Sequence, residues 1–140
     1  MMGLAADAEH VSPAVPKVAI VAAPGDYTTI QGDTVRSTDY DLLARTMALS
    51  VMHKAYAVTG GICLSAAALI EGTVVHQVTR PAASAEGIVR IGHPSGVSTY
   101  VVSVRKRDGG FELTKAAVAG TARRIMDGQV YVPRRLTNFQ

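Results

Sequence analysis

The sequence predicts an α+β domain in which an antiparallel sheet wraps a central apolar helix and a second helix lies outside. Residues 62–70 would be apolar on nearly every face of a helix, so other elements must enclose that helix. Residues 87–119 read as successive strands separated by turn sequences. The length of 140 residues is usual for one domain, which buries roughly two-thirds of the surface of its unfolded chain.

The N-terminal part divides into a lead-in, a strand and a loop. Residues 1–16 are small and polar with two prolines, so we expect a connector before a single domain over residues 17–140. The continuous apolar run Lys17–Ala23 predicts a buried strand, ended by a Pro-Gly pair. A polar loop is expected over residues 26–38.

Two helices are predicted in the middle of the chain. The first runs from Tyr40 to Leu49, with Thr38 or Asp39 as its cap and its apolar residues on one side. The second is the apolar helix. Thr59 can cap its start, and Gly72 can end it in a left-handed conformation.

The C-terminal part reads as β-structure. Residues 93–96 predict a tight turn, and the Asp108-Gly109 pair is a hairpin signal. Strands are therefore expected over residues 87–92, 97–104 and 111–119. Residues 121–132 fit a helix or a strand, and the Val-Tyr-Val run near their end favours a strand.

Composition and charge limit the function classes. Only 5% of the residues are aromatic and Trp is absent, too few rings for base-stacking platforms. The formal net charge is +3, and eight of the fourteen Lys and Arg residues lie from Arg105 onward, against three acids. This excess can attract an anion or belong to the solvated face of ordinary strands. The basic residues are scattered without interleaved aromatics, so we expect no nucleic-acid partner.

The remaining global features indicate a soluble intracellular protein. The one cysteine, Cys63, excludes an intramolecular disulfide framework and fits a reducing compartment. The first residues lack the basic start and apolar stretch of a signal peptide, and the longest apolar run is too short to span a bilayer. We expect a cytoplasmic location and no membrane partner. No metal-ligand spacing occurs, so no metal site is predicted.

The first candidate site is Thr59-Gly60-Gly61 at the start of the apolar helix. Backbone N–H groups at a helix N-terminus, together with the helix dipole, can hold an anion such as a carboxylate. The Thr59 hydroxyl could add a donor. Alternatively, the two glycines let the helix pack close to a strand, and spacing alone does not separate these roles.

The other candidates lie in the predicted turn and before the apolar helix. His93 and Ser95 could donate hydrogen bonds to a substrate oxygen, or the turn could be a plain β-turn with a surface histidine. Lys54 could pair with an acid and His53 could shuttle a proton, although each is often simply solvated. Cys63 lies one turn into the helix, where a thiol can become reactive, but its apolar surroundings favour inert packing.

The sequence resembles the 2-methylaconitate cis–trans isomerase family, which also contains 4-oxalomesaconate tautomerase. The resemblance covers almost the whole chain, and its most specific parts are the Gly-His-Pro-Ser-Gly turn and the Thr-Ala-Arg-Arg stretch. The segments that carry it are residues 17–27, 39–42, 53–60, 70–75, 90–96 and 121–128.

The resemblance implies a diaminopimelate epimerase-like fold with two similar halves and an active site between them, of which this chain matches the C-terminal half. It implies proton transfer beside carboxylates, with C=C isomerisation of a small polycarboxylate and no cofactor or metal. The acid/base lysine and cysteine belong to the other half. Val58 stands here where epimerases of this fold carry a cysteine, and Cys63 is a poor substitute.

The implied partner is an N-terminal half or a second copy of the chain. Without it, the resemblance implies an inactive fragment or subunit; the alternative is a non-catalytic module that binds an organic acid or itself. The substrate-binding residues implied here are Thr59, Gly60, Gly61, His93, Ser95, Lys54 and His53.

Overall fold

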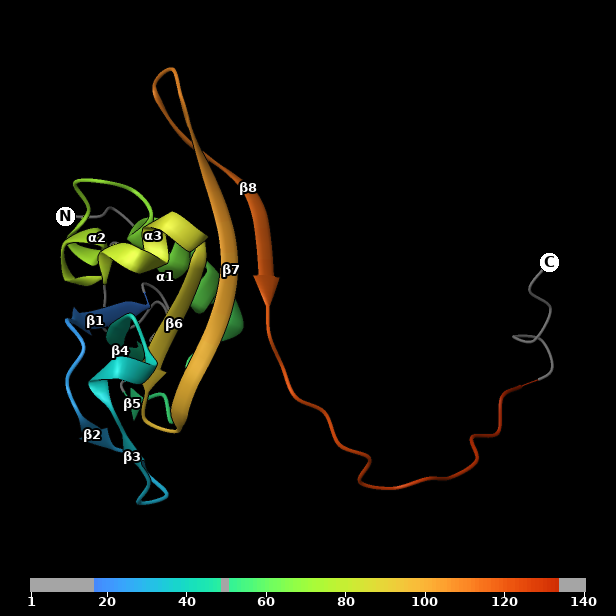
Figure 1. The fold of residues 1–140 in the computed structure, drawn as a ribbon. Coiled ribbons are helices and arrows are strands. Elements are labelled where there is room, and N and C mark those ends of the chain that lie inside the picture. The colour runs from blue at the N-terminus through green and yellow to red at the C-terminus, as the bar shows by residue number, and fades with distance from the viewer. Residues whose placement is uncertain (1–16, 49–50, 134–140) are drawn as a thin grey trace, which may run out of the picture.

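The computed structural model describes residues 17–48 and 51–133, in which a curled mixed sheet carries helices on one face (Figure 1). The strand order is β1-β4-β6-β7-β8, with β5 pairing with the end of β4. The strands are β1 (Val18–Ala22), β4 (Leu42–Ala48), β5 (Val51–Met52), β6 (Ile88–His93), β7 (Gly96–Arg107) and β8 (Gly110–Val118). A separate ribbon pairs β2 (Tyr27–Thr28) with β3 (Thr34–Val35) inside the predicted polar loop.

The α+β class is confirmed, but the sheet is not purely antiparallel. β4 and β6 run parallel, with Leu42 opposite Ile91 and Leu43 opposite Gly92. The chain between these strands contains the three α-helices of the described part, whereas a short 3-10 helix, η1 (Ser37–Asp39), precedes β4. A parallel pair requires such a crossover.

The helix predicted over residues 40–49 is wrong, because Leu42–Ala48 form the strand β4. Along β4, Leu42, Ala44 and Thr46 are buried, whereas Leu43 and Arg45 are half-buried. This period of two is that of a strand, and short apolar runs fit both periods. Pairing with β1 on one side and β6 on the other makes β4 a central strand.

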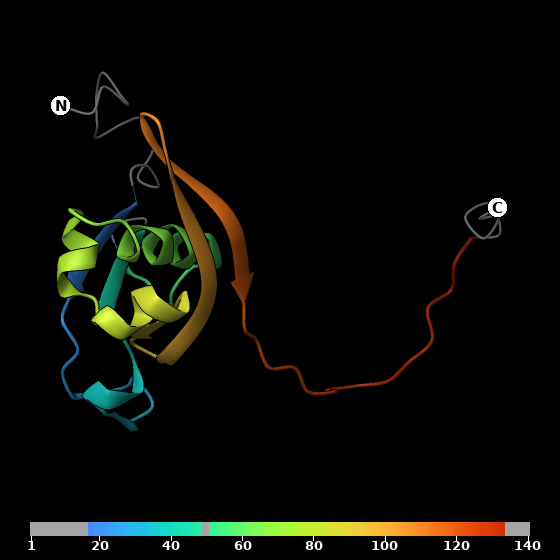
Figure 2. The same ribbon diagram turned by 45° about the horizontal axis from the view of Figure 1, so that its top comes forward.

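Three helices pack on one face of the sheet in the described residues: α1 (Val58–Ala68), α2 (Val74–Val78) and α3 (Pro81–Glu86). One apolar cluster joins all three to β4, β6 and β7, and Figure 2 shows the helices on the concave side of the curved β7. The shared cluster contains Leu42, Ala44, Tyr56, Leu64, Ala68, Val75, Ala83, Val89, Ile91, Tyr100 and Val102. The sequence reasoning did not predict α2 and α3.

The apolar helix α1 is less enclosed than its composition predicted. Leu64, Ser65 and Ala68 are buried, but Thr59 and Cys63 are exposed. The helix therefore has one open stripe in this chain. Its regular part ends at Ala68, before the predicted stop at Gly72, although Gly72 does adopt a positive φ of 88°.

The strands of the C-terminal part lie close to their predicted positions. β6 and β7 meet at the turn after His93, and β7 and β8 meet at the Asp108-Gly109 turn, where Gly109 has a φ of 84°. β1 also forms where predicted, but it is an exposed edge strand rather than a buried one. Residues 119–133 form neither a helix nor a strand; they run away from the sheet as an exposed, extended segment (Figure 1).

The predicted connector over residues 1–16 lies outside the described residues. The prediction of one domain over residues 17–140 therefore stays a prediction. No helix within residues 17–48 and 51–133 combines the length and the hydropathy that a membrane crossing requires.

Candidate functional site

The predicted turn at the end of β6 is held by tyrosine and arginine side chains. The Tyr27 hydroxyl lies 2.6 Å from the carbonyl oxygen of Gly96 and 3.0 Å from that of His93. Arg45 Nη1 donates to the Gly92 carbonyl at 3.4 Å, and its guanidinium carbon lies 5.2 Å from the centre of the Tyr27 ring. The β2 strand and β4 thus fix the turn from the side opposite the helices.

His93 is 5% exposed and both of its ring nitrogens have partners inside the chain. Nδ1 accepts the Ser95 backbone N–H at 3.2 Å, and Nε2 lies 2.8 Å from Ser98 Oγ. The accepted bond requires an unprotonated Nδ1, so the proton sits on Nε2 and points to Ser98. Burial lowers the pKa of His93, and the charge of Arg45 lowers it further. His93 is therefore a neutral, buried imidazole and not a surface histidine.

Ser95 joins the turn to the segment before α1. Its Oγ donates to the Lys54 carbonyl at 2.5 Å, which links residues that are 41 positions apart. His53 next to it donates its backbone N–H to the Thr46 carbonyl at 2.8 Å, while its Nδ1 accepts the Ala55 N–H at 3.1 Å. The His53 and Lys54 side chains are exposed. The structure thus brings these two predicted candidates next to the turn.

The N-terminus of α1 begins two residues earlier than predicted. Ala57 is the N-cap, in extended conformation, and no side chain caps the helix. Gly61 N–H donates to the Ala57 carbonyl at 2.8 Å, so it is part of the helix. The amides of the first three helical residues, which include Thr59 and Gly60, have no i−4 carbonyl within the helix. Thr59 is the second helical residue, not the cap.

The two glycines of α1 differ in their surroundings. A Cβ on Gly61 would lie 2.6 Å from Tyr100 Cε1 and closer still to Cζ and Oη. A Cβ on Gly60 would meet its nearest atom, Tyr56 Cε1, at 3.5 Å, an ordinary contact. Gly61 therefore lets α1 approach β7, where the buried Tyr100 fills the space of the missing side chain.

Cys63 is exposed, whereas its apolar neighbours predicted inert packing. It lies on the open stripe of α1 together with Thr59. Across the described ranges, no three His, Cys, Asp or Glu side chains gather as a metal would require. Proton transfer by Cys63 stays a prediction.

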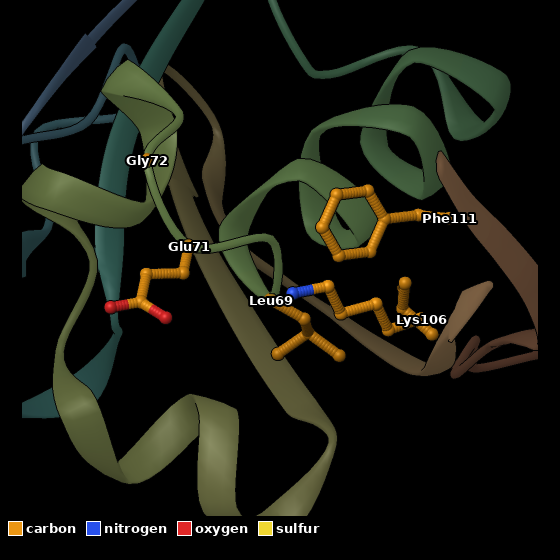
Figure 3. Close-up of a pocket in the computed structure, with 6 residues that line it drawn as sticks. Leu69, Glu71, Gly72, Lys106 and Phe111 are labelled. Atoms are coloured by element: carbon orange, nitrogen blue, oxygen red, sulfur yellow. The ribbon is translucent and has the colours of Figure 1, made fainter. Parts of the chain in front are cut away.

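The two hollows described lie away from the predicted site residues. One of about 420 Å³ lies between the end of α1 and the β7–β8 hairpin, and Figure 3 shows Lys106 and Phe111 projecting there toward Leu69 while the Glu71 carboxylate points away. The other, of about 320 Å³, lies against α2 and the start of α3. Neither is lined by the residues proposed for substrate binding.

Sequence reasoning missed the residues that hold the turn, namely Tyr27, Arg45 and Ser98, and it also missed Tyr100, which packs against Gly61 of α1. Ser98 and Tyr100 carry a local signal, since they alternate along β7 on the face that packs against α1. Tyr27 and Arg45 reach the turn from distant segments, and one sequence gives no signal for such contacts.

Comparison with known proteins gives this arrangement a context. The chain is 47% identical over 137 residues to 3-methylitaconate isomerase of Eubacterium barkeri, covering 95% of this chain and 35% of that protein. It is 36% identical over 118 residues to 2-methyl-aconitate isomerase of Cupriavidus necator, covering 84% of this chain and 29% of that protein. The crystal structure of methylitaconate-delta-isomerase matches with a TM-score of 0.74 and 45% identity, over 93% of this chain and 33% of that one.

The chain thus spans about one third of the length of the relatives that it matches. The family model described as PrpF protein matches residues 1–133, which is nearly all of the sequence. The match includes the turn, α1 and the extended C-terminal segment. This chain belongs to the PrpF protein family.

Proposed function

We propose that this chain supplies the carboxylate-binding part of an isomerase for a small unsaturated polycarboxylate, and that a separate lobe supplies the acid/base pair. The relatives are named as isomerases of methylitaconate and methyl-aconitate, which sets the class of substrate. Because this chain spans about one third of them, the reaction itself is a property of the complete assembly.

The observation that carries this proposal is the uncapped N-terminus of α1 beside the Ser95–Lys54 contact. Three backbone amides point out of the helix there, and the helix dipole favours an anion. The exposed Lys54 side chain, four residues before the helix, supplies a full positive charge. Thr59, on the first turn, adds a hydroxyl donor.

In this proposal, His93 and Ser95 do not donate hydrogen bonds to the substrate. The His93 ring nitrogens and the Ser95 hydroxyl already have partners in the chain. We therefore assign both to positioning: they hold the segment that carries Lys54 against the end of β6. Direct contact with the carboxylate is assigned to Thr59, Gly60 and Lys54.

The chemistry that follows binding is removal of a proton from a carbon beside a carboxylate and its return at another carbon as the C=C bond moves. Such a step needs a base, an acid and donors that stabilise the developing enolate-like charge. The α1 amides and Lys54 would act as these donors. No residue of this chain is assigned as the catalytic base or the catalytic acid. Cys63 lies about one turn further along α1 than the amides that have no carbonyl partner within the helix.

Complementation tests the proposal. The chain is mixed with the part of the Eubacterium barkeri isomerase that it does not match, and 3-methylitaconate isomerisation is followed by NMR. We expect activity in the mixture and none in either part. Lys54→Met and Thr59→Val should each weaken substrate binding by about tenfold, which corresponds to about 1.4 kcal/mol. Lys17→Met removes another exposed ammonium and should change nothing. A complex that forms but stays inactive would refute the proposed function.

A further inference from the structure

The protonation state of the buried His93 ring decides whether the turn after β6 can keep its hydrogen bonds. Nδ1 of the ring accepts the Ser95 backbone N–H at 3.2 Å, and Nε2 lies 2.8 Å from Ser98 Oγ. A protonated imidazole carries a hydrogen on both nitrogens and accepts no hydrogen bond. Protonation of His93 would therefore point two N–H groups at each other and must break the bond to Ser95.

The charges that act on His93 oppose a positive charge on its ring. Burial lowers the pKa of His93 most, and the charges of Arg45 on β4 and of His53 before α1 lower it further. Lys54 places an exposed ammonium next to His53. A protonated ring in its present position would thus be buried beside other cations, which costs free energy unless the ring gains water or a carboxylate.

The elements around the turn offer no carboxylate to the ring within the described ranges. They present hydroxyl and thiol groups instead, from Tyr27 on β2, Ser98 and Tyr100 on β7, and Cys63 on α1. The acids on adjoining elements are exposed or engaged elsewhere: Asp26, Asp33, Asp39 and Glu86 are exposed, and Arg90 engages Asp41. A protonated His93 is therefore stabilised only when its ring reaches water.

Ser95 connects the turn to the segment that carries Lys54. Its hydroxyl donates to the Lys54 carbonyl, and the same residue donates its backbone N–H to His93. One position earlier, His53 donates its backbone N–H to the Thr46 carbonyl at 2.8 Å, which holds the segment against β4. Loss of the bond to His93 thus frees the residue that ties Lys54 to the turn.

The contacts on the other side of the turn do not depend on the His93 ring. The Tyr27 hydroxyl bonds the backbone carbonyls of His93 and Gly96, and the Ile30 N–H donates to the Pro94 carbonyl at 2.8 Å. These bonds anchor the turn to the β2–β3 ribbon in either protonation state. Movement on protonation is therefore confined to the side of the turn that faces the segment before α1.

We propose that His93, Ser95 and Lys54 form a pH-sensitive switch, in which uptake of a proton by the His93 ring breaks its bond to Ser95 and releases the Lys54 segment from the turn. The arrangement in which Ser95 is bound holds His93 with a pKa below 6.5, so it is complete at neutral pH and is lost as the pH falls through that lowered value. The loss of carboxylate binding in acid rests on the proposed function, because Lys54 is one of its assigned contacts. The movement of the segment does not.

Amide hydrogen exchange of the full chain without ligand, followed by NMR and corrected for the intrinsic exchange rate, tests the switch. The Ser95 N–H reports the turn, and the His53 backbone N–H reports the Lys54 segment. At about pH 5.5, one unit below the ordinary histidine pKa of 6.5, both protection factors should be about tenfold lower than at about pH 7.5. Val102 N–H, which donates to the Gly87 carbonyl at the other end of β6, reports global unfolding, and its protection factor should exceed both at each pH.

Three variants assign the effect to its residues. In His93→Asn the side-chain carbonyl can accept the Ser95 N–H but takes up no proton, so both protection factors should stop depending on pH. Ser95→Ala keeps the backbone bond to His93 and removes the hydroxyl bond to Lys54, so the amide at position 95 should keep its pH dependence while that of His53 loses it. His53→Asn is the matched control for the other histidine; its backbone N–H remains and should behave as in the wild type.

The wild type alone tests the switch if a variant does not fold, because nitrogen-15 NMR of the His93 ring must show proton uptake over the pH range in which Ser95 loses protection. A ring that is protonated without a change at Ser95, or that stays neutral down to about pH 5, would overturn the proposal. Equal protection of Ser95 and Val102 would do the same, since the turn would then open only with the whole fold. Loss of the pH dependence in His53→Asn would assign the effect to His53 instead.

These measurements separate the switch from the proposed function. They contain no carboxylate and no second lobe, so their failure leaves carboxylate binding at the start of α1 to its own test. Conversely, failed complementation with normal exchange behaviour would refute the proposed function and leave the coupling of His93 to the Lys54 segment standing.

Discussion

Substitution of Gly61 by alanine tests how α1 packs on the sheet. The new Cβ would lie 2.6 Å from Tyr100 Cε1 and nearer to the end of the ring, where ordinary contacts are 3.4 Å or more. The ring is 1% exposed and cannot move into solvent without losing its burial. Overpacking of this kind costs about 1–3 kcal/mol, while alanine gains about 1 kcal/mol over glycine in helix propensity. Since the required shift is large, we expect a net loss of about 2 kcal/mol in the free energy of unfolding.

Gly60→Ala is the matched control, because it makes the same chemical change one residue earlier in the same helix. Its Cβ meets nothing closer than 3.5 Å, so it should be neutral or stabilise the chain by up to about 1 kcal/mol. Urea unfolding followed by circular dichroism measures both variants. Equal midpoints for the two would refute the contact between Gly61 and Tyr100.

A double-mutant cycle separates this contact from a general effect of alanine. Tyr100→Leu removes the ring end that the Cβ would strike, so Gly61→Ala should cost less in that background. We expect a coupling of about 1–2 kcal/mol, within the range measured for residues in contact. If the effects of Gly61→Ala and Tyr100→Leu are additive, the cost of Gly61→Ala does not come from contact with the Tyr100 ring.

Three further predictions concern polar groups. Burial lowers the pKa of His93 below its unfolded value of 6.5, so the unfolded chain binds more protons. The contribution of His93 to the free energy of unfolding should be fully present above about pH 7 and should decrease as the pH drops through 6.5. In urea titrations, His93→Asn should flatten this pH dependence, whereas His76→Asn should leave it unchanged. Ser98→Ala removes the partner of His93 Nε2, so nitrogen-15 NMR should show more of the Nδ1–H tautomer, and an unchanged tautomer would contradict the assignment. Asp41 is 4% exposed and accepts hydrogen bonds from the Arg90 backbone N–H at 2.8 Å and from the Arg90 guanidinium at 3.4 Å. Asp41→Asn should therefore lower the free energy of unfolding by about 2 kcal/mol in the same assay. A loss under about 0.5 kcal/mol would show that the pair is dispensable.

The parts of the fold that were predictable are those whose signals are local. The turn after His93 and the Asp108-Gly109 hairpin depend on residues that are adjacent in sequence, and both turns form as expected. The missed helices also carried local signals. Thr73 caps α2 by accepting the His76 N–H at 3.0 Å, and Pro81 and Gly87 begin and end α3 as proline and glycine commonly do.

The wrong predictions concern segments whose secondary structure or contacts depend on residues that are distant in sequence. The residues of β4 satisfy a helical and a strand period equally, and only the neighbours β1 and β6 make them a strand. The contact between Ser95 and Lys54 joins positions far apart in sequence, so only the structure could identify it. The spacing of Gly60 and Gly61 allowed both an anion site and close packing; the coordinates give the packing role to Gly61, while anion binding by Thr59 and Gly60 stays a proposal.

The strength of the proposed carboxylate site depends on whether water is excluded from it. A charge at an exposed helix terminus gains only about 0.3–1 kcal/mol, and an exposed ion pair with Lys54 adds about 0–1 kcal/mol. Together these terms fall short of the roughly 4 kcal/mol that a Kd of 1 mM represents. The isolated chain should therefore bind an unsaturated dicarboxylate no more tightly than about 1 mM, and calorimetry with the docked second lobe should give much tighter binding, because the same groups act more strongly in a dry cleft. Micromolar binding by the isolated chain would mean that the site is complete without a partner.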